Sequence, residues 1–165
     1  MDEVDRIVGA WQRERPDLDV TPLQVLSRVT RLSRYLDRAR SAAFARHGLE
    51  TWEFDVLAAL RRSGAPYCLS PGLLVAQTMV TSGTMTNRID RLAGRGLVRR
   101  QPDPADGRGV MVHLEDSGRA LADAALADLL QIERTVLAVL DPDQNEHLSG
   151  LLRDLLTSLE MPASR

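Results

Sequence analysis

Apolar positions along this 165-residue chain recur mainly at spacings of three and four residues, which is the period of amphipathic helices. Alternation of apolar and polar residues at 110–114 instead predicts a strand, and an extended run that begins at Leu97 predicts its hairpin partner. The chain is therefore expected to be mainly α with a small β-hairpin. The helices are expected at about 2–15, 23–46, 51–62, 71–79, 82–93, 117–140 and 142–160.

Residues that favour helix ends support these boundaries. Ser70 is a good N-cap and Pro71 suits the first helical position, where a missing N–H costs nothing. Thr21 and Pro22 repeat this arrangement, so Thr21 is expected to cap the second helix. Glycines at 94 and 96 can adopt the left-handed conformation that ends a helix.

Helix, tight turn, helix and hairpin follow one another between Ser70 and Leu114. This order is typical of a winged helix-turn-helix, whose second helix lies in the major groove of DNA. The hairpin, or wing, carries Arg108 between two glycines at its tip. An arginine there can enter a minor groove, where the negative potential is high.

The second helix of this unit has two different faces. Met85, Ile89 and Leu92 form an inward face, and Arg88 lies at its border. Residues 81–100 contain five arginines and one acid. This charge favours contact with DNA, although an ordinary amphipathic helix with a solvated arginine face is the alternative. The residues expected to contact DNA are Ser82, Thr84, Asn87, Arg91, Arg95 and, on the wing, Arg108.

Charge is distributed unevenly along the chain. The formal net charge is −2, so the total does not indicate a nucleic-acid partner. Residues 115–160, however, hold ten acids and three arginines, in contrast to the cationic second helix. All 21 basic residues are arginine, which we attribute to coding bias.

Long helices with leucine faces flank the winged unit on both sides. About half of the chain lies in them, which is more than a small winged domain needs for its core. We expect the first and last helices to form a two-fold dimer, which would place two reading helices roughly 34 Å apart, one turn of DNA. Packing within one chain is the alternative.

Other chemistry is sparsely represented. The chain has a single cysteine, Cys68, so an internal disulfide is excluded. We expect Cys68 to be a buried structural thiol, and a redox role is the alternative. Three histidines (His47, His113 and His147) lie in separate elements, so no metal site is expected. No nucleophile–base pair, cofactor motif, signal peptide or membrane span is apparent. These features predict a cytoplasmic protein that is not an enzyme and has no cofactor.

The order of elements and the run VTSGTMTNRIDRLAGRGLVRRQPDPADGRG resemble the MarR (multiple antibiotic resistance regulator) family over nearly the whole chain. The resemblance implies one domain over 1–165. Residues 1–48 and 116–160 would serve dimerisation, with 1–48 also on the ligand side, and 49–115 would be the winged helix-turn-helix. It also implies a homodimer on a palindromic operator, repression relieved by a small molecule, and an ion pair in which Asp106 orients a wing arginine.

A narrower resemblance is to the urate-responsive branch of this family. It is carried by the added first helix with its tryptophan and by RERPDLDVTP, FDVLAALRRSGAPY and SGTMTNRIDRL. It implies ligand-binding roles for Trp11, Asp55, Arg88 and Arg100. Asp55 lies opposite the apolar face of its helix, so it can pair with an arginine of another helix or stand exposed near Arg62. Trp11 could equally be a core aromatic residue.

Together these features predict a ligand-responsive, sequence-specific DNA-binding repressor, released by a small anionic or aromatic ligand such as urate. Two alternatives remain: a redox-sensing regulator that uses Cys68, and a winged-helix module for protein contact. The exposed polar stripe on the second helix favours DNA, because a protein-contact surface would expose apolar groups there.

Overall fold

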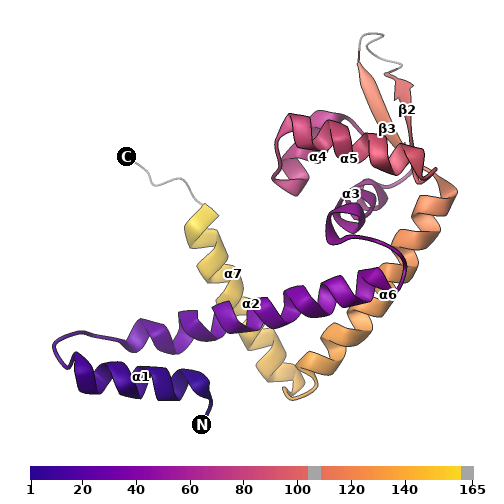
Figure 1. Ribbon diagram of the computed structural model, residues 1–165. Coiled ribbons are helices and arrows are strands. Elements are labelled where there is room, and N and C mark those ends of the chain that lie inside the picture. The colour runs from indigo at the N-terminus through magenta and orange to yellow at the C-terminus, as the bar shows by residue number, and fades with distance from the viewer. Residues whose placement is uncertain (104–108, 161–165) are drawn as a thin grey trace. The chain divides into compact units, whose positions relative to one another are not determined.

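The computed structural model describes residues 1–103 and 109–160. Within these ranges the chain is mostly helical with one small antiparallel sheet, which confirms the predicted fold class (Figure 1). The chain divides into two compact units, Met1–Leu126 and Ala127–Arg165. The elements are α1 (Glu3–Glu14), α2 (Thr21–Ala45), α3 (Thr51–Arg62), β1 (Cys68–Leu69), α4 (Pro71–Thr78), α5 (Ser82–Gly94), β2 (Val98–Pro102), β3 (Val110–Leu114), α6 (Asp116–Leu137) and α7 (Pro142–Glu160).

Side-chain caps begin most of these helices where the sequence places them. The Ser70 hydroxyl accepts from the Leu73 amide ahead of α4, and the Thr81 hydroxyl accepts from the Thr84 amide ahead of α5. The expectation for Thr21 was wrong, because this residue lies inside α2 and makes no cap. The Asp19 carboxylate instead accepts from the Thr21 amide at 2.9 Å, so an aspartate two residues earlier satisfies that helix end.

The core of the first unit lies between the helices of its winged part. Phe44 from the end of α2 stacks on Phe54 of α3 with ring centroids 4.0 Å apart. The inward face predicted for α5 is confirmed, since Met85, Ile89 and Leu92 are all fully buried. This packing fixes α5 on α4 and β2 and turns its opposite face outward.

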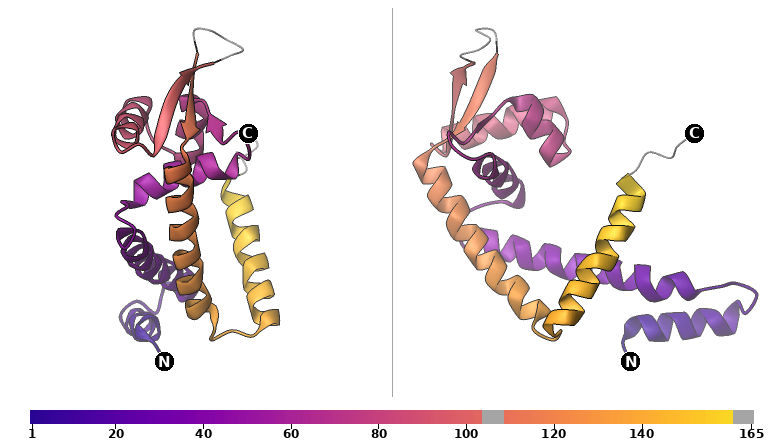
Figure 2. Two further views of the ribbon diagram at one scale, coloured as in Figure 1. Left: turned by 90° about the vertical axis from the view of Figure 1, so that its right-hand side faces the viewer. Right: turned by 180° about the vertical axis from the view of Figure 1, so that it is seen from behind.

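The sheet has the strand order β1-β3-β2 and is antiparallel throughout. Arg100 of β2 pairs with Val112 of β3, and Cys68 of β1 pairs with His113. Figure 2 shows β2 and β3 extending together beyond the helices as the wing. Strand β1 thus adds a third, two-residue strand to the hairpin that the sequence predicts.

Gly118, in the first turn of α6, is packed closely against the segment before β2. A Cβ atom at this position would lie 2.2 Å from the carbonyl oxygen of Leu97. The Ser117 hydroxyl also donates to the Gly96 carbonyl at 2.7 Å. The start of α6 is therefore joined to the base of the wing by a contact that only glycine permits.

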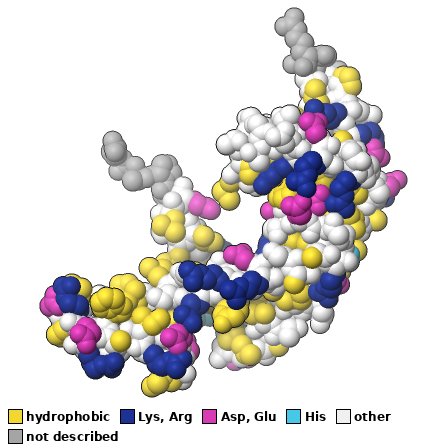
Figure 3. All heavy atoms as spheres, in the orientation of Figure 1, with side chains coloured by type: hydrophobic (Ala, Val, Ile, Leu, Met, Phe, Trp, Pro, Cys, Tyr) yellow, Lys and Arg dark blue, Asp and Glu magenta, His cyan; other side chains and the backbone are white. Residues whose placement is uncertain are grey.

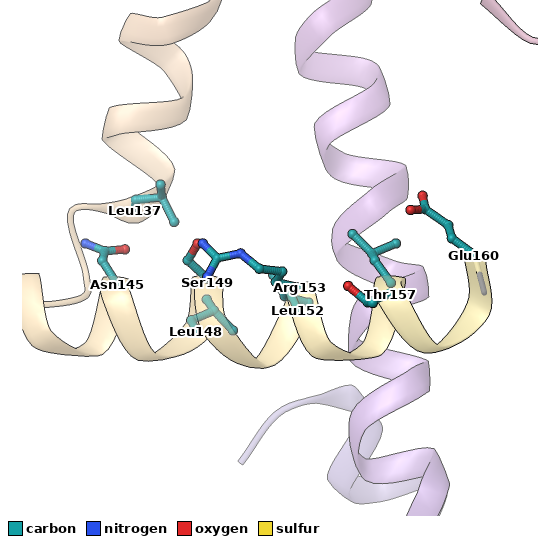
Figure 4. Close-up of a pocket in the computed structure, with 9 residues that line it drawn as sticks. Leu137, Asn145, Leu148, Ser149, Leu152, Arg153, Thr157 and Glu160 are labelled. Atoms are coloured by element: carbon teal, nitrogen blue, oxygen red, sulfur yellow. The ribbon is translucent and has the colours of Figure 1, made fainter. Parts of the chain in front are cut away.

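The long helices carry large apolar side chains that no part of their own unit covers. On α2 these are Val25, Leu26, Val29, Leu32 and Tyr35, and Figure 3 shows apolar surface over α1 and α2. In the second unit, Leu155 and Leu156 of α7 are also exposed. Figure 4 shows an open groove in this unit, where Leu137 at the end of α6 lies beside α7 residues that include Leu148 and Leu152.

Helix α6 ends at Leu137 rather than near residue 140 as expected, and the Asp141 carboxylate accepts from the Gln144 amide at the start of α7. Among the described residues, none of the helices is long and apolar enough to span a membrane.

Candidate nucleic-acid interface

The outward face of α5 is polar and accessible. Ser82, Thr84, Asn87 and Arg91 are all exposed, while the opposite face of the helix is buried. The Thr84 hydroxyl lies 2.9 Å from the hydroxyl of the cap residue Thr81, so it is held at the first turn of the helix. This face offers hydroxyl, amide and guanidinium groups, which are the groups that bind phosphates and base edges.

Arg91 is held by two residues of the α3 amino terminus. Its Nη2 donates to Glu50 Oε1 at 2.6 Å, and its guanidinium lies over the Trp52 ring, 4.7 Å from the centroid. Trp52 Nε1 donates to the other Glu50 oxygen at 2.8 Å. These two hydrogen bonds, from Trp52 first and Arg91 second, lower the pKa of Glu50 below its ordinary value. Figure 3 shows cationic and acidic side chains adjoining over α3 and α5.

Arg95 is exposed, as predicted, but it also makes hydrogen bonds at the start of α3. Its Nη1 donates to both oxygens of Glu53 at 2.7 Å, and its Nη2 donates to the Gly48 carbonyl at 3.1 Å. The Glu53 side chain is only 3% exposed and needs a cation beside it, which explains why Arg95 turns toward α3. Arg95 therefore anchors the end of α5, and its expected contact with DNA is not favoured by this geometry.

Asp55 forms an inter-helix ion pair of the kind expected from the sequence. Its Oδ1 lies 3.5 Å from Nη2 of Arg40 on α2. Burial raises the pKa of Asp55 above its ordinary value, and the nearby charges of Arg40, Arg88 and Arg62 only partly offset this. A half-buried carboxylate among three arginines is a site where a bound anion would change the local balance of charge.

Arg88 and Arg100 have different partners in the structure. The Arg88 guanidinium lies over the Trp52 ring at 5.3 Å, on the same ring that Arg91 contacts. Arg100 of β2 pairs with Asp90 at 2.7 Å and donates to the Thr86 carbonyl at 3.3 Å. Arg88 therefore faces α3, whereas Arg100 is tied to α5.

Trp11 lies away from these residues within one chain. Helix α1 is joined to the first half of α2, where Arg28 binds Asp2 and Asp5. Asp55 instead meets α2 at Arg40, twelve residues farther along, or about 18 Å at the helical rise. Trp11 is half exposed. One chain by itself therefore does not gather the four expected ligand residues into one pocket.

Three residues that the sequence analysis passed over contribute to this surface. Glu50 and Glu53 hold the arginines of α5, and Trp52 contacts two of them. Acids spaced three apart at the start of a helix are a sequence signal for a cap, and the Glu50 amide does donate to Glu53. That signal does not indicate which arginine each acid would meet.

Asp106 and Arg108, the expected wing residues, lie outside the described residues. Among the residues that the structure describes, no group of three His, Cys, Asp or Glu side chains is placed to hold a metal ion.

Comparison with known proteins identifies relatives of this chain. A model of the MarR family matches residues 47–109. The HTH-type transcriptional regulator PecS of Dickeya dadantii is 41% identical over 150 residues, which cover 91% of this chain and 90% of PecS.

Two solved structures extend the comparison. A MarR variant from Escherichia coli complexed with operator DNA has a TM-score of 0.69 at 26% identity, and the match covers 84% of this chain and 99% of that chain. BpsR of Bordetella bronchiseptica, solved in a study of the regulation of its DNA binding by 6-hydroxynicotinic acid, has a TM-score of 0.60 at 31% identity. That match covers 77% of this chain and 91% of that chain.

Proposed function

This chain belongs to the MarR family of transcriptional regulators, which are not enzymes, and we propose that it is a repressor that binds a palindromic operator as a homodimer and is released by a small aromatic anion. The observation that carries the DNA-binding part is the two-sided helix α5. One side is fully buried in the winged unit, and the other presents Ser82, Thr84, Asn87 and Arg91 to solvent. A related protein has been solved on operator DNA, which supports the same use of this helix.

The proposed wing contact completes this interface. We expect Arg108 to enter a minor groove and Asp106 to orient it by an ion pair, as the family resemblance implies.

The proposed homodimer rests on the uncovered apolar faces of the long helices. Leucines and valines that stay exposed on α2 and α7 would lose contact with water if a second copy covered them. A two-fold arrangement would bring two copies of α5 to one duplex and would match a palindromic site.

Salt-dependent DNA binding tests the main proposal. The protein is titrated with duplex from the region upstream of its own gene and with a random duplex, at several salt concentrations. We expect a preference for the upstream duplex and an affinity that falls steeply with salt, since each neutralised phosphate releases counterions. Absent or salt-insensitive binding would instead favour a module for protein contact.

The proposed ligand site uses Asp55, Arg88, Arg100 and Trp11, and it would need the proposed homodimer, because one chain alone does not gather all four. The two arginines would bind the anion, and Trp11 would stack near it. The anion would compete with Asp55 for the surrounding arginine charge. Because Arg88 is part of α5, its movement would then shift the reading helix. The anion can release DNA only if it binds more tightly to the arrangement of the protein that does not bind DNA than to the one that does. That a relative's DNA binding is regulated by 6-hydroxynicotinic acid, an aromatic acid, supports this ligand class.

A thermal-shift screen of purines and phenolic acids identifies the ligand, and release from DNA is then measured with the compounds that bind. Urate is expected to raise the melting temperature and to weaken DNA binding. If oxidant, but no purine or phenolic acid, releases DNA, the redox alternative at Cys68 replaces this proposal.

A further inference from the structure

We propose that Glu50 and Trp52 are positioning residues that set the direction of Arg91 for DNA reading, and that the Trp52 ring couples Arg91 to Arg88. This inference rests on the proposed use of α5 in DNA binding. It assigns a function to the N-cap residue of α3 and to one residue of its first turn, neither of which belongs to the helix that meets DNA.

The contacts form a closed arrangement of three side chains. Glu50 accepts one hydrogen bond from Arg91 and one from Trp52, on different oxygens, at 2.6 and 2.8 Å. Arg91 also covers the Trp52 ring. Each member of this cluster therefore contacts both of the others, so the guanidinium is held at a defined place before DNA arrives.

The hold on Arg91 is reversible because it is exposed. The side chains of Arg91 and Glu50 are 60% and 56% exposed, and exposed ion pairs contribute little to stability. The side chain of Glu53, which holds Arg95, is only 3% exposed. Arg95 therefore cannot leave Glu53 for DNA at low cost, because a buried carboxylate would lose its cation. Of these two arginines, Arg91 is thus the one that can leave a carboxylate for a phosphate or a base.

Arg88 reaches the same ring from one turn earlier on α5. Its guanidinium lies 5.3 Å from the Trp52 centroid, against 4.7 Å for Arg91. Two cations on one ring cannot move independently, since they repel each other and share its faces. Trp52 is also three residues from Asp55 on α3, so both lie on one side of that helix. A change at Arg88 can therefore reach Arg91 through this ring.

A double-mutant cycle tests the positioning role. Wild-type protein first selects a duplex from a random library, and each variant's affinity for this duplex is compared with its affinity for random DNA. We expect Trp52→Leu to lower this preference about tenfold, the loss typical of one base contact. In an Arg91→Ala background the same change should alter the preference less than about twofold, because coupled residues are not additive.

Conservative variants separate positioning from a purely structural role. Trp52→Phe keeps an aromatic face for the arginines and should restore most of the preference. Glu50→Gln should strengthen binding to random DNA while lowering the preference, and in an Arg91→Ala background its effect on the preference should vanish. Arg88→Ala should change the preference of the wild-type protein but not of Trp52→Leu. Circular dichroism checks that each variant is folded.

The outcomes distinguish this inference from the proposed function. If wild-type protein selects no duplex, the DNA-binding proposal fails, and the inference fails with it. If it selects one but the Trp52 and Arg91 effects are additive, only the positioning role is overturned. If Arg88→Ala acts equally in both backgrounds, the coupling through Trp52 is overturned. Should Trp52→Leu fail to fold, the cycle of Glu50→Gln with Arg91→Ala decides the positioning role, because Glu50 bonds Arg91 directly.

Discussion

Arg95 and the buried Glu53 form an ion pair that joins the end of α5 to the start of α3, with both carboxylate oxygens 2.7 Å from one guanidinium nitrogen. The same guanidinium donates to the Gly48 carbonyl, so Arg95 also reaches the loop before α3. This pair sets the position of the reading helix against the rest of the winged unit.

Arg95→Ala should therefore destabilise the fold. It leaves a buried carboxylate without its cation, a change that costs about 3 kcal/mol in proteins. Urea denaturation followed by circular dichroism measures the free energy of unfolding. Arg91→Ala is the matched control, because its partner is exposed and its loss should cost at most about 1 kcal/mol. Equal stabilities of the two variants would contradict the structural role of Arg95.

Gly118→Ala should also destabilise the protein. The added methyl would lie 2.2 Å from the Leu97 carbonyl oxygen, and a backbone atom cannot move aside as a flexible side chain could. Overpacking of this kind costs about 1–3 kcal/mol. Gly94→Ala is the control, since nothing lies within 4 Å of the corresponding Cβ, and alanine there should be neutral or slightly stabilising. Thermal unfolding of both variants compares them directly.

Attachment of α1 should weaken in acid. The hydrogen bond from Arg28 lowers the pKa of Asp2, and the hydrogen bond from the Asp2 amide, followed by that from Arg28, lowers the pKa of Asp5. A lowered pKa means that the stabilising contribution is present above the ordinary value near 4 and is lost as the pH falls through the lowered values. Amide NMR signals of α1 between pH 6 and 2 follow this change. Arg28→Gln should remove the part that its hydrogen bonds cause and leave the part due to the Asp2 amide on Asp5.

Much of the fold was predictable because local patterns determine it. Helix α3 and strand β3 have the predicted bounds, and Ser70 acts as the predicted cap, because cap and period signals are local. Thr21 was wrongly assigned because the neighbouring Asp19 satisfies that helix end. The pairing of Arg95 with Glu53 was not predicted, because a helical wheel contains no information about another helix. The partners of the α5 arginines depend on tertiary packing, which sequence spacing does not encode.

Asp55→Asn should reduce release by urate while leaving DNA binding nearly unchanged. The amide keeps the shape of the side chain but removes the charge whose displacement by the anion would move the surrounding arginines, so an anion could bind without shifting α5. DNA release is titrated with urate in wild type, Asp55→Asn and a control, Asp123→Asn. In the wild type, Asp123 of α6 pairs with Arg61 of α3. Identical titrations in all three proteins would exclude Asp55 from the ligand site.

Trp11→Phe should likewise reduce release by urate, since phenylalanine has a smaller surface for stacking. The same titration measures it, and Tyr35→Phe serves as a control on another exposed aromatic residue. If Trp11→Phe responds as wild type does, Trp11 serves only to attach α1.

Cys68→Ser should leave release by urate intact. The thiol is half buried in β1, which pairs with β3, and no part is assigned to it in the ligand site. Urate titration of the variant checks this expectation. Loss of the response would support the redox alternative.

The cations on α5 and β2 are guanidinium groups without exception, and the chain contains no lysine. Acetyl and ubiquitin transfer act on the lysine amine, so neither modification can neutralise this surface. Arginine also keeps its charge throughout the physiological pH range. Adjustment of the charge here by protons can therefore occur at the opposing Glu50 carboxylate, which is open to solvent.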